Sequence, residues 1–132
     1  MTFPTIRPGL RGEMRLKVEP VHTARHLGSG NVEVLATPEM IRLMERAAVA
    51  AVDHLLPEGY RTVGVALDVR HLAATPVGLT VRARATLTEV DGRRLVFEVE
   101  AHDPVERVGT GVHERFIVDK ARFEQRVNEK RA

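Results

Sequence analysis

Four consecutive segments between residues 62 and 119 alternate apolar and polar side chains, which is the period of a β-strand with one buried face. Their sequences are TVGVALDVRH, LTVRARATLTEV, LVFEVEAHD and GVHERFIVD. The first three predict apolar faces formed by Val63, Val65, Leu67 and Val69, by Leu79, Val81, Ala83, Ala85 and Leu87, and by Leu95, Phe97, Val99 and Ala101. Strands this close in sequence form an antiparallel sheet, and its apolar face needs another layer to cover it.

The sequence of the fourth segment does not indicate which of its two sides is buried. One parity carries Val112, Glu114, Phe116 and Val118, and the other carries His113, Arg115 and Ile117. Between the second and third segments, the pair Asp91-Gly92 predicts a type I′ hairpin turn.

Residues 35–55, LATPEMIRLMERAAVAAVDHL, predict the covering layer, a long helix with one apolar stripe. Thr37 is the predicted N-cap and Pro38 the first helical residue, whereas Pro57 and Gly59 end the helix. The stripe contains Met40, Met44, Ala47, Ala48, Ala51 and Leu55.

The rest of the chain fits around these elements. The segment EMRLKVEP predicts a first strand, residues 21–34 predict a loop, and KARFEQRVNEK predicts an amphipathic helix that pairs Phe123 with Val127. One helix against an antiparallel sheet makes a two-layer α+β domain over residues 1–132. This order is typical of the hot-dog fold, in which a curled sheet wraps around one long central helix.

Composition limits the functions that such a domain can have. The chain is 43% hydrophobic and has no run of the roughly 18 apolar residues that a membrane span needs, so we expect a soluble protein. It has no cysteine and begins without an apolar signal segment, which favours the cytoplasm. A net charge of only +2 and five aromatic residues argue against nucleic-acid binding.

Three residues fit a plain core poorly. Glu45 lies at the margin of the apolar stripe, where a carboxylate is either salt-bridged at the surface or a partly buried acid, base or nucleophile. His71 shares the parity of the apolar residues at the end of its strand, so it either bonds a loop carbonyl or serves as a general base. Thr37 is explained as a helix cap unless its hydroxyl takes part in chemistry.

Two further residues carry weaker signals. Gly64 interrupts a strand, which often marks close approach of a ligand or backbone, and Arg115 can pair with a carboxylate. The six histidines show no metal-binding spacing, and there is no GxSxG, P-loop or GxGxxG motif. We therefore expect neither a metal nor a cofactor.

Five segments together resemble the fluoroacetyl-CoA thioesterase family of the hot-dog superfamily. They are TARHL, LATPEMIRLMERAAV, DVRHLAATPVGLTV, DGRRLVFEVEAHD and GTGVHERFIV. The resemblance implies an acyl-CoA thioesterase that forms a homodimer or a dimer of dimers, with active sites where two subunits meet. It also implies a catalytic set of Thr37, Glu45 and His71, assisted at the substrate by Gly64 and Arg115.

The implied reaction is the hydrolysis of a small acyl-CoA thioester to a free acid and coenzyme A. The fluoroacetyl-specific enzyme of this family carries a longer, aromatic-containing segment before the catalytic helix, whereas this chain has only GSGNVEV, so we do not expect fluoroacetyl selectivity. Two alternatives remain open at this level: an enoyl-thioester hydratase, and an acyl-CoA-binding or regulatory module without turnover.

Overall fold

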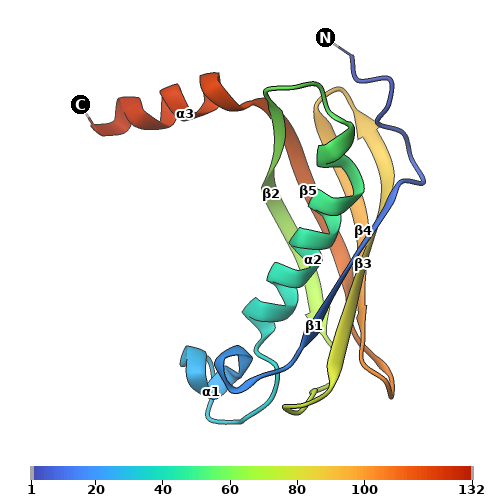
Figure 1. Ribbon diagram of the computed structural model, residues 1–132, viewed down its shortest axis with the longest axis vertical. Helices are drawn as coiled ribbons and strands as arrows, with labels where there is room; N and C mark the ends of the chain where they lie inside the picture. Colours follow the sequence, from blue (N-terminus) through green and yellow to red (C-terminus); the bar gives the residue numbers. More distant parts are fainter. Residues whose placement is uncertain (1, 132) are drawn as a thin grey trace.

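The computed structural model describes residues 2–131 and places one helix across a five-stranded antiparallel sheet (Figure 1). The strands lie in the order β1-β3-β4-β5-β2. Their bounds are β1 Arg11–Lys17, β2 Tyr60–His71, β3 Thr80–Asp91, β4 Arg94–His102 and β5 Arg107–Asp119. The helices are α1 Ala24–Leu27, α2 Thr37–Val52 and α3 Lys120–Asn128, with short 3₁₀ turns η1 Pro20–His22, η2 Asp53–Leu55 and η3 Glu129–Arg131.

The core lies between α2 and the inner face of the sheet. From α2 it takes a continuous stripe of side chains, which are Met40, Leu43, Met44, Ala47, Ala48, Ala51 and Val52. From β3 and β4 it takes Val81, Ala83, Ala85, Leu87, Leu95, Phe97, Val99 and Ala101. The predicted α+β architecture, an antiparallel sheet around one long central helix, is confirmed, as are the predicted buried faces of β3 and β4.

The predicted single apolar face of β2 is wrong. A register shift between Gly64 and Ala66 divides the strand, so that Val63 pairs with the outward-facing Phe116 while Leu67 pairs with the inward-facing His113. Val65 is 57% exposed and Leu67 41% exposed. Both side chains are exposed because α2 packs mainly against β1 and β3 and leaves β2 largely uncovered.

Three smaller predictions also need correction. The N-cap of α2 is Ala36, not Thr37, and no side chain caps this helix. The β3–β4 hairpin joins Asp91 to Arg94 through Gly92 and Arg93, and only Gly92 has a positive φ, which is the type II′ pattern. The segment predicted as a loop contains the single helical turn α1, which Thr23 caps by accepting from the His26 N–H.

The fourth segment, left open by its sequence, becomes β5 with His113, Arg115 and Ile117 turned toward α2. The amphipathic helix is also present as α3, which extends away from the sheet (Figure 1) and buries no residue. Within residues 2–131 no helix is both long and apolar enough to cross a bilayer.

Candidate active site

Thr37 and His71 form a hydrogen-bonded pair at one end of the molecule. Thr37 begins α2 and His71 ends β2, and the Thr37 Oγ1 lies 2.8 Å from the His71 Nδ1. Because Ala36 takes the N-cap position, the Thr37 hydroxyl makes no cap and is available to the imidazole. The pair lies in a cavity of about 420 Å³, whose wall continues through Val34, Leu35 and Leu72.

The environment of His71 suits a general base. Burial lowers its pKa, so the imidazole is neutral near pH 7. In the tautomer with hydrogen on Nε2, the Nδ1 lone pair accepts the proton of the Thr37 hydroxyl. A hydroxyl within hydrogen-bond distance of a neutral imidazole is the arrangement that activates an oxygen nucleophile. The Nε2 atom is buried and has no hydrogen-bond partner among residues 2–131.

Glu45 belongs to a second group, farther along α2. Its side chain is 38% exposed, and its Oε2 lies 3.8 Å from the Nη1 of Arg115. Gly64 on β2 faces the same carboxylate, because a Cβ added there would lie 3.0 Å from the Glu45 Oε2. The predicted neighbours Glu45, Gly64 and Arg115 are therefore brought together by α2, β2 and β5.

Arg115 is the buried member of this group, with a side chain only 8% exposed. Its Nε donates to the Thr62 Oγ1 at 2.8 Å, and its Nη2 donates to the Thr62 carbonyl at 2.9 Å. Its Nη1 lies 3.1 Å from the Nε2 of His113. The Thr62 hydroxyl in turn donates to Asp53. Thr62, His113 and Asp53 were not singled out from the sequence. The one sequence signal that points to this cluster is that His113 and Arg115 share a parity on their strand.

The two groups are separate within one chain. Thr37 and Glu45 are eight residues apart on α2, about 12 Å along its axis. Gly64 and His71 are seven residues apart on β2, about 23 Å. Among residues 2–131, no hydrogen bond or ion pair connects Glu45 to Thr37 or His71. Leu67 and Val69 lie between the two groups on the inward side of β2.

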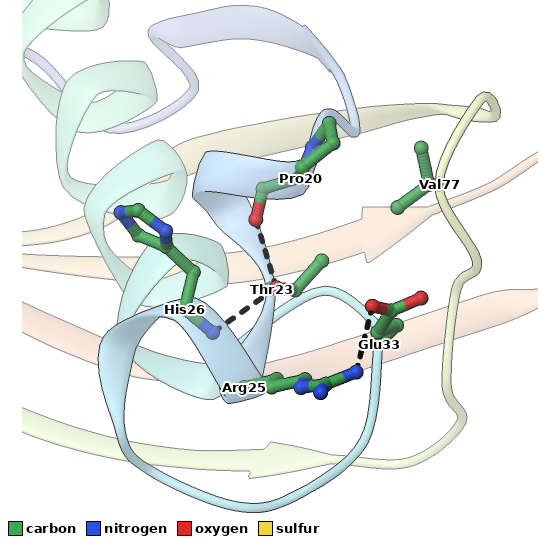
Figure 2. Close-up of a pocket in the computed structure, with 6 residues that line it drawn as sticks. All are labelled: Pro20, Thr23, Arg25, His26, Glu33 and Val77. Carbon is green, nitrogen blue, oxygen red and sulfur yellow. Dashed lines mark hydrogen bonds and ion pairs between the residues drawn. The ribbon is translucent and has the colours of Figure 1, made fainter.

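A second cavity, of about 460 Å³, lies beside α1 (Figure 2). Three of its polar side chains, those of Thr23, Arg25 and Glu33, are engaged with other groups of the protein. Thr23 bonds the Pro20 carbonyl and the His26 N–H, and Arg25 pairs with Glu33 at 3.1 Å. None of the candidate residues Thr37, Glu45 and His71 lines this cavity.

Known proteins resemble this chain over nearly its whole length. A family model described as fluoroacetyl-CoA-specific thioesterase matches residues 18–121. The fluoroacetyl-CoA thioesterase of Streptantibioticus cattleyicolor is 41% identical over 131 residues, covering 95% of this chain and 94% of that protein. A solved structure of the fluoroacetyl-CoA thioesterase FlK is 41% identical and superimposes with a TM-score of 0.88, covering 95% of this chain and 97% of the other.

A hot-dog-like protein from Thermanaerovibrio acidaminovorans superimposes with a TM-score of 0.89 at 34% identity, covering 98% of this chain and 97% of the other. The hot-dog fold expected from the order of elements is thereby confirmed. The matched range 18–121 contains both groups of candidate residues.

Proposed function

Since the chain belongs to the fluoroacetyl-CoA-specific thioesterase family, we propose that it hydrolyses a small acyl-CoA thioester to the free acid and coenzyme A. The observation that carries this proposal is the 2.8 Å contact between the Thr37 hydroxyl and the His71 imidazole in an open cavity. Thr37, Glu45 and His71 are the proposed catalytic residues, and Gly64 and Arg115 face the substrate beside Glu45.

In the first step, His71 takes a proton from the Thr37 hydroxyl or from a water molecule beside it. The oxygen attacks the thioester carbonyl carbon, and negative charge develops on the carbonyl oxygen. The N–H groups in the first turn of α2 favour that charge, because the helix dipole is positive there. Breaking the C–S bond releases the coenzyme A thiolate, which takes the proton from His71; if Thr37 attacked, water then hydrolyses the acyl-enzyme.

The Glu45 carboxylate can assist the reaction because its oxygens are not hydrogen-bonded by the described part of the protein. It makes no hydrogen bond within residues 2–131, and Arg115 approaches at 3.8 Å, beyond hydrogen-bond distance. The carboxylate is thus oriented by charge while its lone pairs stay available to water or to the acyl carbon.

The active assembly that we propose is a homodimer, alone or within a dimer of dimers, formed through the edge strand β2. Exposed edge strands pair readily with another chain, and β2 carries the exposed Val65 and Leu67. In a two-fold dimer, antiparallel pairing places the His71 end of one β2 beside the Tyr60 end of the other. Thr37 and His71 of one subunit then approach the partner's Glu45, which would join the two groups that lie apart within one chain.

The substrate that we propose has a short acyl group without a requirement for fluorine. FlK has been solved as a mutant with acetyl-CoA bound and as another mutant with fluoroacetate and CoA bound. Here residues 28–34, GSGNVEV, supply no aromatic side chain to cover a fluorinated acyl group. Val34 and Leu35 instead form an aliphatic wall of the cavity.

A free-thiol assay over a panel of short acyl-CoA thioesters tests the reaction. We expect thiol release by the wild-type protein, with losses in Glu45→Gln and His71→Ala. Addition of water to an enoyl-CoA without thiol release would identify a hydratase instead. Saturable binding with no turnover of any thioester would identify a binding module.

Mixing two inactive variants tests the shared site. In a mixed dimer of Thr37→Ala and Glu45→Gln chains, one site keeps both an intact Thr37 and the partner's intact Glu45. Random exchange of subunits should therefore restore about a quarter of the wild-type activity. If each chain instead builds its site alone, the mixture stays inactive.

A further inference from the structure

Arg115 has more partners than its ion pair with Glu45 requires. Thr62 binds the guanidinium twice, through its hydroxyl and its carbonyl, and His113 contacts the remaining terminal nitrogen. Removing a guanidinium from water is unfavourable unless its donors are paired, so these contacts allow Arg115 to remain charged while buried. They also determine which of its nitrogens faces Glu45.

The hydrogen bonds of His113 define its proton. The ring is fully buried, and its Nδ1 lies 2.9 Å from the carbonyl oxygen of Ala66, which can only accept. Nδ1 therefore carries the hydrogen, and Nε2 is left with the lone pair that accepts from the Nη1 of Arg115. Burial first, and then the charge of Arg115, lower the pKa of His113, which is consistent with this neutral form.

Thr62 is fixed from the other side by Asp53, the residue that follows α2. The Thr62 hydroxyl accepts from Arg115, so its own hydrogen goes to the Asp53 Oδ1 at 2.6 Å. The Thr62 N–H also donates to the Asp53 Oδ2 at 3.2 Å. The negative charge of Asp53 is thus linked to Arg115 through the Thr62 hydroxyl.

These contacts leave Arg115 little freedom to move. It cannot rotate toward Glu45 to form a direct hydrogen bond without breaking its bonds to Thr62 or His113. We propose that Thr62, backed by Asp53, and His113 are positioning residues that hold Arg115 at ion-pair distance from Glu45. The carboxylate then keeps its orientation and its free lone pairs. This assignment rests on the proposed role of Glu45 in thioester hydrolysis.

Thr62→Val removes the hydroxyl and nearly preserves the shape of the side chain. We expect kcat to fall about 10- to 100-fold with little change in KM, because misplacement of a charged group weakens the reacting geometry more than binding. Thr62→Ser should recover most of kcat. As a matched control, Thr88→Val removes a strand hydroxyl that bonds the Val96 carbonyl, away from Arg115, and should leave kcat unchanged. A folded Thr62→Val protein with wild-type kcat would overturn the proposal.

A measurement on the wild-type protein is independent of turnover and of whether Thr62→Val folds. Long-range proton–nitrogen NMR distinguishes imidazole tautomers, and a His113→Asn variant identifies the His113 signals. We expect a neutral ring with hydrogen on Nδ1. A cationic ring, or hydrogen on Nε2, contradicts the proposed contacts of Arg115 even if the enzyme is active. Conversely, the expected tautomer in a protein without thioesterase activity refutes the proposed function and leaves the contacts around Arg115 supported.

Discussion

At the residue scale, the candidate site consists of residues that do not make the structural contacts usual for their positions. Thr37 makes no helix cap, so its hydroxyl can bond His71. Glu45 lies near Arg115 without a hydrogen bond to it. Gly64 has no side chain where even a methyl group would press on the Glu45 carboxylate. Each position therefore gives a substitution whose effects on activity and on stability should separate.

Gly64→Ala should reduce activity with little net change in stability. An added Cβ would lie 3.0 Å from the Glu45 Oε2, so the carboxylate must shift by a few tenths of an ångström. We expect kcat to fall about 10-fold, because reacting geometry tolerates little displacement. The free energy of unfolding should stay nearly level, because the gain of about 0.5–1 kcal/mol from alanine in a strand is offset by the tight contact of 3.3 Å between the added Cβ and Cε1 of the buried His113 ring. Denaturant titrations and thiol-release kinetics measure the two effects.

The double variant Gly64→Ala/Glu45→Gln is the control for this prediction. If Gly64→Ala acts through the Glu45 carboxylate, adding Gly64→Ala to the Glu45→Gln variant should lower activity little further. Full additivity of the two losses would show that Gly64 acts elsewhere.

The activity should depend on pH through His71. Burial lowers the pKa of this group below its ordinary value of about 6.5, and only the neutral ring accepts a proton. We expect kcat/KM to rise with pH through a midpoint below about 6.5 and then to level off. A midpoint above neutrality would contradict the assignment of His71 as the base.

Stability must be followed over the same pH range. The unfolded chain binds protons more readily than the folded chain at both His71 and His113, because burial lowers both pKa values. Their contribution to stability is therefore full above about pH 6.5 and is lost as the pH falls through the folded-state pKa values. Circular dichroism at each pH separates loss of the base from loss of the fold.

At the element scale, the position of α2 depends on its close approach to β1. A Cβ at Gly12 would lie 2.0 Å from the Ala47 carbonyl oxygen and 2.5 Å from the Ala51 nitrogen, both helix backbone atoms. Neither atom can move aside without shifting the helix. Because α2 packs closely on β1, it also lies over β3 and covers the inward side of β2 less. Leu67 and His71 lie on that less covered side.

Gly12→Ala should therefore destabilise the fold by about 1–3 kcal/mol or more, as overpacking does. Gly30→Ala is a suitable control, because its Cβ would meet only the Ala24 Cβ at 3.6 Å, an ordinary contact. Chemical denaturation of the two variants gives the comparison. Equal stabilities would mean that α2 and β1 are not packed as closely as described.

At the scale of the whole molecule, one chain presents two separate groups of candidate residues and an edge strand, β2, with exposed apolar side chains. Thr37 with His71 and Glu45 with Arg115 lie on the two sides of Leu67, and β2 carries exposed apolar residues at the edge of the sheet. Pairing two copies through β2 would cover this edge and bring the groups of different chains together.

Val65→Lys should shift the protein toward monomers and lower its specific activity at low concentration. A lysine on an edge strand discourages pairing by placing charge where another strand would pack. Val105→Lys is the matched control, because Val105 is 77% exposed in the turn between β4 and β5 and belongs to no strand. Sedimentation measurements report the assembly. An unchanged oligomer in Val65→Lys would place the interface elsewhere.

Local patterns were enough to predict most of the architecture, because periodicity reports the burial of each element. Alternation predicted the buried faces of β3 and β4, and the apolar stripe predicted the face of α2 that meets them. Glu45 and His71 also stood out locally, Glu45 at the margin of the apolar stripe and His71 on the parity of the apolar residues of its strand, and Arg115 was noted as a possible partner of a carboxylate.

Other features depended on contacts between residues far apart in the chain. The register shift at Gly64 divides β2, because pairing with β5, rather than the alternation of β2 itself, orients its side chains. The Thr37 hydroxyl bonds a residue 34 positions away instead of capping its own helix, and Thr62 becomes a partner of Arg115 across 53 positions. A sequence pattern describes the exposure of each element by itself, whereas hydrogen-bond partners are chosen by which elements lie side by side after folding.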